Sequence, residues 1–124
     1  MKYTIDKREK LSVLTLDEEN LNSLIAPDLK SDLLILKNEG INNLVVDLSK
    51  VKYVDSSGLS AILTGNRMWK DSGSFVVTGI ESPMVKKLIE ISKLDTVLSI
   101  VSSMEEAVGL IHMEEIERDM NAGE

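Results

Sequence analysis

The chain has 124 residues, of which 43% are hydrophobic, and this size and composition predict one folded domain and exclude global disorder. It contains no cysteine and one histidine, which excludes disulfides, thiolate metal sites and multi-histidine metal centres. The formal net charge of -7 argues against direct binding to nucleic acid or to an anionic membrane surface.

The first third of the chain has the residue patterns of a hairpin, a loop and a helix. Lys2–Asp6 and Leu11–Leu16 alternate apolar and polar residues or contain β-branched ones, which predicts two strands. The acidic, asparagine-rich stretch Asp17–Ser23 predicts a loop. Leucines at helical spacing predict a helix over Ala26–Asn38, with Pro27 in its first turn, where a missing N–H is not needed.

The middle of the chain predicts two buried strands with a helix between them. Gly40 can take the left-handed conformation that ends the preceding helix. Asn43–Leu48 and Phe75–Thr78 are short, nearly continuous apolar runs, as in strands buried on both faces. Ser57–Asp71 has its apolar residues on one helical side, and we expect Trp69 to be partly buried at the end of that helix.

The last third predicts a helix, a strand and a final helix. Ser82-Pro83 is a cap followed by proline at the first helical position, and Val97–Val101 is the final strand. Ser103–Glu106 is a Ser-x-x-Glu capping box that opens the last helix. Its predicted inward face is Ala107, Val108, Leu110 and Ile111.

Alternation of strands and helices after a hairpin predicts an α/β fold. We expect a mixed sheet of about five strands with about four helices, mainly covering one face. The domain should span residues 1–112. Residues 113–124 should form an acidic helix end that frays, because the last eleven residues contain five acids and one base.

No segment of the sequence suggests insertion into or transfer across a membrane. No apolar run approaches the roughly 18–20 residues of a bilayer span. The N-terminal MKYTIDKREK has no apolar stretch after its charges, so no signal peptide is expected. We therefore expect a cytoplasmic protein.

The segment Asp55-Ser56-Ser57-Gly58-Leu59, between a strand and a helix, is the strongest candidate for a functional site. Three of its residues can cap a helix, and only one cap is needed. Free N–H groups and the positive end of the helix dipole would tolerate a phosphate on an exposed serine there. A docked partner would be repelled by the same phosphate. The alternative is that these residues only cap the helix.

Other chemistry has weaker support in the sequence. A catalytic Ser56 would need a base, and the single histidine, His112, is distant in sequence and expected at the surface. Asp47 more simply ends a strand than pairs with Asp55 around a metal. We expect Met84, Met104, Met113 and Met120 to lie in the core or in frayed helix. No cofactor or metal site is predicted.

The segment from Leu44 to Leu59 resembles the STAS domain, and more narrowly the bacterial anti-sigma factor antagonists. The matching residues are the strand Leu44-Val45-Val46-Asp47-Leu48-Ser49 followed by Val54-Asp55-Ser56-Ser57-Gly58-Leu59. The resemblance covers residues 1–112. It implies a regulator without enzymatic activity that binds an anti-sigma factor, which is also a serine kinase, and that a phosphatase resets.

In this family, the serine directly after the aspartate accepts the phosphate, which by position is Ser56. The resemblance implies a partner-binding surface made of Asn22, Ser23, Asp55, Ser56, Ser57, Gly58 and Leu59. The family's loop after the second strand is usually Gly-x-[Ile/Leu]-Asp, whereas this chain has Glu19-Asn20-Leu21-Asn22. Asn22 thus replaces the aspartate.

Two alternatives stay open at this point. The chain could be a STAS scaffold that is never phosphorylated, such as the small subunit of a lipid-transport ATP-binding-cassette complex. Ser57 could also be the acceptor in place of Ser56.

Overall fold

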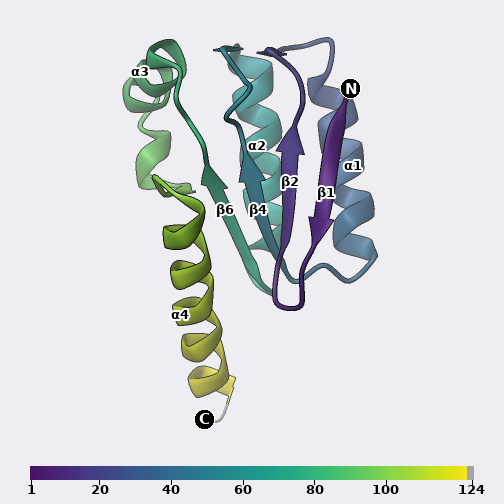
Figure 1. Cartoon of the computed structure of the whole chain (residues 1–124), viewed down its shortest axis with the longest axis vertical. Helices are drawn as coiled ribbons and strands as arrows, with labels where there is room; N and C mark the ends of the chain where they lie inside the picture. Colours follow the sequence, from purple (N-terminus) through teal and green to yellow (C-terminus); the bar gives the residue numbers. More distant parts are fainter. Residues whose placement is uncertain (123–124) are drawn as a thin grey trace.

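The computed structural model describes residues 1–122 and contains a five-stranded mixed sheet with the order β1-β2-β4-β6-β7 (Figure 1). Residues 123–124, the end of the predicted acidic tail, lie outside the described residues. The predicted hairpin is confirmed, because β1 pairs antiparallel with β2, and the remaining pairs are parallel. The last strand is shorter than predicted. The strands are Tyr3–Lys7 (β1), Ser12–Leu16 (β2), Asn43–Asp47 (β4), Ser74–Thr78 (β6) and Ser99–Ile100 (β7).

Within residues 1–122, four helices pack on this sheet and confirm the predicted α/β fold. Helices α1 and α2 lie side by side over one face, α3 packs beside β5 in the same core, and α4 covers the other face (Figure 1). A short 3-10 turn, η1, follows α3. The bounds are Ala26–Asn38 (α1), Ser56–Trp69 (α2), Pro83–Ile91 (α3), Leu94–Thr96 (η1) and Met104–Ala122 (α4).

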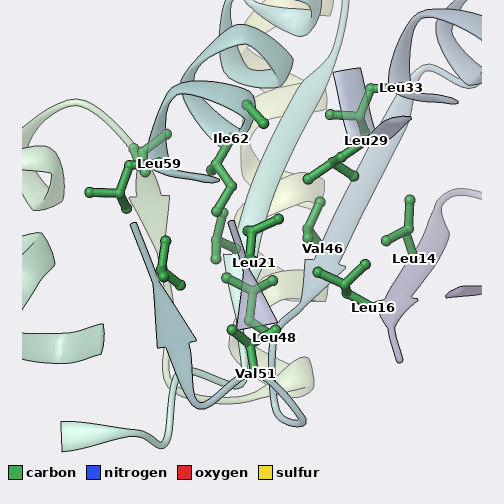
Figure 2. Close-up of a cluster of buried hydrophobic side chains, with 14 of the residues drawn as sticks. Leu14, Leu16, Leu21, Leu29, Leu33, Val46, Leu48, Val51, Leu59 and Ile62 are labelled. Atoms are coloured by element: carbon green, nitrogen blue, oxygen red, sulfur yellow. The ribbon is translucent and has the colours of Figure 1, made fainter. Parts of the chain in front are cut away.

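Strict alternation of side chains along the central strands divides the core into two layers. In β4, Leu44 and Val46 face α1 and α2, whereas Val45 between them faces α4. All three are at most 1% exposed, which explains the continuous apolar run in the sequence. Figure 2 shows the larger layer, in which strand side chains lie opposite those of α1 and α2.

Two strands of two residues each were missed by the sequence analysis. Asn20–Leu21 (β3) lies inside the predicted loop and pairs in parallel with Tyr53–Val54 (β5). Each is too short to show periodicity, so only the tertiary structure reveals them. Together they bring the segment before α1 next to the segment before α2.

Trp69 is fully buried rather than partly buried, so this expectation was wrong. Its indole Nε1 donates a hydrogen bond to the carbonyl of Ile41 at 3.0 Å, and its ring lies 5.7 Å from that of Phe75. A buried tryptophan needs such an acceptor, and the loop after α1 provides one. The tryptophan therefore belongs to the core and not to an interface.

Helix α4 has 19 residues and continues to Ala122, and the fraying of this acidic helix end stays a prediction. Arg118 explains this continuity. Its guanidinium donates to the Ser74 hydroxyl at 3.1 Å and to the Asn43 side-chain oxygen at 3.2 Å, and both acceptors are buried on the sheet. None of the helices within residues 1–122 combines the length and apolar character that a bilayer span requires.

The predicted capping box at the start of α4 forms only in part. The Ser103 hydroxyl accepts a hydrogen bond from the Glu106 amide at 3.1 Å, as expected. The Glu106 carboxylate, however, accepts from the Ser102 hydroxyl at 2.8 Å and the Ser102 amide at 3.3 Å. These bonds hold the pKa of Glu106 below its ordinary value.

Replacing Arg118 should test how firmly α4 is held on the sheet. We expect Arg118→Met to lower the free energy of unfolding by about 1–2 kcal/mol, because two hydrogen bonds from a charged donor to buried acceptors are lost. Urea denaturation measures this. Arg67→Met, an exposed arginine on α2, is the matched control and should change stability by less than about 0.5 kcal/mol. Equal effects of the two substitutions would contradict this role.

Candidate functional site

The first turn of α2 is capped by Asp55. Its backbone is extended, and its Oδ1 accepts a hydrogen bond from the Gly58 amide at 2.9 Å. Helix α2 therefore begins at Ser56, one residue earlier than predicted, and ends at Trp69. Because the aspartate is the cap, Ser56 is the first helical residue and its exposed side chain is not used for capping.

Asp55 also fixes the segment that precedes α1. Its second oxygen, Oδ2, accepts a hydrogen bond from the Ser23 amide at 3.2 Å, and its own amide donates to the Leu21 carbonyl at 3.2 Å. The Asn22 side chain accepts from the Leu24 amide at 3.0 Å and folds the loop into a tight turn. The structure thus brings Asn22 and Ser23 next to the start of α2.

Gly58 allows this close contact between the two segments. A Cβ on Gly58 would overlap the carbonyl oxygen of Leu21 and would lie 2.8 Å from Leu21 Cγ. Any larger residue would push α2 away from β3. The glycine is therefore explained by packing within the chain.

Leu59 has a different position from the one expected of a partner contact. Its side chain is 7% exposed and points into the core layer under α2 (Figure 2). It shares the inward face of α2 with the buried Ile62, and its predicted contact with a partner stays a prediction. Leu59 anchors the helix on which Ser56 is displayed.

An open depression of about 330 Å³ lies beside Ser56, between the starts of α1 and α2. Ser56 is exposed and Ser57 is half-buried, so the Ser56 hydroxyl is the more accessible of the two. The sequence analysis missed Lys30 and Ser60, because only the pairing of α1 with α2 brings them here. The depression is lined by Ser23, Ala26, Pro27, Lys30, Ser56, Ser57 and Ser60.

Exposed apolar side chains come from the segments around this depression. Leu24, in the loop that Asn22 folds, is 83% exposed. Tyr53 of β5 is 54% exposed, and Met84, at the start of α3, is 48% exposed. Helix α3 packs against β5, so these side chains belong to the edge of the molecule where α1, α2 and α3 begin (Figure 1). These three exposed side chains are candidates for contact with a partner protein.

The single histidine is far from this depression in the fold. His112 is exposed on α4, which covers the face of the sheet opposite α2. The depression itself is open and contains one cation and several hydroxyl groups. Such a surface can receive a covalent group and contact a partner.

The family model of the STAS domain matches residues 2–107 of this chain. This chain belongs to the STAS domain family. The match covers every strand and helices α1 to α3, and it ends within the first two turns of α4.

Individual relatives of this STAS domain include anti-sigma factor antagonists. BtrV of Bordetella bronchiseptica, named as a proposed anti-sigma factor antagonist, is 28% identical over 86% of this chain and 91% of its own length. An anti-sigma factor antagonist from Mycobacterium paratuberculosis superposes with a TM-score of 0.80 at 19% identity, over 90% of this chain and 93% of that one.

A second solved structure is the Bacillus cell fate determinant SpoIIAA in its phosphorylated form. It superposes with a TM-score of 0.64 at 17% identity, over 89% of this chain and 99% of that one. At these identities the two solved structures show that the fold is shared.

Substitution of Gly58 should test whether α2 needs a glycine at this position in order to pack closely against β3. We expect Gly58→Ala to lower the free energy of unfolding by about 1–3 kcal/mol, because the new methyl group overlaps the Leu21 carbonyl. Gly109→Ala is the control, since a Cβ there meets nothing within 4 Å, and it should raise stability by about 0.5–1 kcal/mol. Thermal or urea denaturation measures both. A neutral Gly58→Ala substitution would contradict the close contact.

Proposed function

We propose that this STAS protein is an anti-sigma factor antagonist whose docking surface is centred on Ser56 and is switched by phosphorylation of that residue. The observation that carries the proposal is the exposed Ser56 side chain at the first position of α2, left free because Asp55 makes the cap. The phosphorylated relative SpoIIAA supports it, as does the name of BtrV. The protein acts by binding and catalyses no reaction itself.

The fold can accept a phosphate on Ser56 with little local cost. The group would add about -1.5 to -2 charges at neutral pH, at a helix end where the dipole is positive. Lys30 lines the same depression and supplies a positive charge from α1. Within residues 1–122, Lys30 has no ion pair that would have to break first.

The same phosphate would weaken the binding of a docked partner. Two unit charges 4 Å apart interact by about 4 kcal/mol at an effective dielectric constant of about 20. A difference of about 1.4 kcal/mol corresponds to a tenfold change in affinity. An acidic partner group at that distance would therefore weaken binding roughly a thousandfold. An apolar partner surface would have to desolvate the phosphate instead. Phosphorylation would therefore release the partner and leave the fold unchanged.

Asn22 keeps the loop geometry that the family's aspartate would give. Its side-chain oxygen makes the turn bond to the Leu24 amide, which a carboxylate oxygen could make equally. The replacement removes one negative charge from the surroundings of Asp55 and Ser56. We infer that the loop still docks the partner and that the local field opposes a phosphate less than an aspartate would.

The partner we propose is an anti-sigma factor that is also a serine kinase. Its contact surface would cover Ser56 and the apolar side chains Leu24, Tyr53 and Met84. A phosphatase would restore the unphosphorylated form. Binding of the unphosphorylated protein would free a sigma factor and so regulate transcription.

Ser56→Asp should weaken partner binding and preserve the fold. Immobilised wild-type protein should recover a kinase-like ATPase from native lysate, and calorimetry with the recovered partner should show at least about tenfold weaker binding by Ser56→Asp. Ser56→Ala should bind like the wild type. Asn121→Asp, which adds the same charge on the last turn of α4, is the control. Equal binding by Ser56→Asp would contradict the switch, and recovery of a transporter ATPase would favour the scaffold role.

Lys30 should lower the second pKa of a phosphoserine at position 56. Phosphoserine can be introduced there by genetic encoding, so no natural kinase is required, and its pKa can be followed by phosphorus NMR titration. Lys30→Met should raise that pKa because a nearby cation is removed, whereas Lys30→Arg should restore it. Lys87→Met, an exposed lysine on α3, should leave it unchanged. The same pKa in wild type and Lys30→Met would refute the role of Lys30.

A further inference from the structure

Helix α4 has apolar residues on two opposite faces. Ala107 and Ile111 on the inner face are at most 1% exposed and pack against Val45 and Val76 of the sheet. The outer face has three large apolar side chains in solvent, and the methionines among them were expected in the core or in frayed helix. Their exposed fractions are 60% for Met113, 46% for Ile116 and 69% for Met120. Nothing within residues 1–122 uses this outer face.

The outer side chains form a straight row along the helix. Gly109, Met113, Ile116 and Met120 follow one another at intervals of four, three and four residues. This is the spacing of the core positions of a coiled coil, which places them on one stripe that faces a neighbouring helix. The row spans about 17 Å at 1.5 Å per residue. We call these four residues the outer α4 seam.

Gly109 has no explanation inside the chain. It is exposed in the middle of a helix, and a Cβ at this position would meet nothing within 4 Å. Glycine is a poor helix former, so the fold would be better served by alanine. A glycine in such a seam allows the backbone of another helix to approach closely.

The charged side chains beside the seam determine which kind of helix could pack on it. With Met113 and Ile116 as core positions, the flanking coiled-coil positions include Glu105, Glu117 and Asp119, which are all exposed acids. Arg118, the only base of the tail, is bonded to the sheet on the opposite side of the helix. A second copy of this chain would therefore bring like charges together. A helix with lysine or arginine at its flanking positions would complement them.

We propose that the outer α4 seam docks a basic amphipathic helix of a partner protein. This surface lies on the face of the sheet opposite α2, so it can be occupied while the Ser56 surface is engaged or released. It is independent of the proposed switch and gives the protein a second attachment point. Methionine side chains suit this role because they adapt to partners of varied shape.

A designed peptide can test the seam directly. The probe is a labelled peptide of three heptads with leucine at the core positions and lysine at the flanking positions, where charge repulsion keeps the free peptide monomeric. Fluorescence anisotropy with the full chain should show saturable binding that weakens with salt. The double substitution Met113→Glu with Met120→Glu should weaken binding at least about tenfold. Ile91→Glu, at an exposed apolar residue at the end of α3 that belongs to neither proposed surface, should leave it unchanged.

Further outcomes also decide the proposal. Gly109→Ala should weaken peptide binding and raise thermal stability. Because the two effects have opposite signs, the loss of binding could not be attributed to a loss of folded protein. A peptide with glutamate at its flanking positions should not bind, and equal binding by it would overturn the proposed charge recognition. Unchanged binding by the double variant, or a dimer of the wild type in sedimentation at the same concentrations, would overturn the assignment of the seam to a basic helix.

Discussion

The carboxylate of Asp55 accepts hydrogen bonds from two backbone amides that belong to distant parts of the chain. One bond, to Gly58, starts α2, and the other, to Ser23, fixes the loop before α1, 32 residues earlier. The display of Ser56 depends on this pair of bonds. Because the aspartate makes the cap, the serine hydroxyl that follows it stays in solvent, and because the loop is drawn in, apolar Leu24 is presented near it.

The two proposed surfaces differ in how charge acts on them. At Ser56 the positive groups are the α2 dipole and Lys30, which would offset the neighbouring Asp55 carboxylate, so the fold would accept the proposed phosphate and a docked partner would be repelled by it. The acids beside the outer α4 seam are present whether or not the protein is phosphorylated, and they select a basic partner. The sheet separates the two surfaces, so a change at one does not require movement of the other. A small domain can thereby have one regulated and one constant contact.

Much of the fold could be predicted because its signals are local. The bounds of α1, the cap at Ser82 with Pro83 after it, and the left-handed Gly40 follow from a few neighbouring residues each. The buried position of Trp69 and the bond from Arg118 to the sheet depend on residues distant in sequence, and no local pattern reports them. At the site, the DSSG motif predicted Ser56 and Asp55, whereas Lys30 and Ser60 required the packing of α1 against α2.

The central claim is that Ser56 is the group that a partner kinase modifies. The most direct measurement is intact-mass analysis of the chain after incubation with ATP and the partner recovered from lysate, followed by mapping of the modified peptide. The account predicts a gain of about 80 Da, the mass of one phosphoryl group, located on Ser56 and abolished by Ser56→Ala. No gain in mass, or a phosphate on Ser57 or elsewhere that persists in Ser56→Ala, would contradict it.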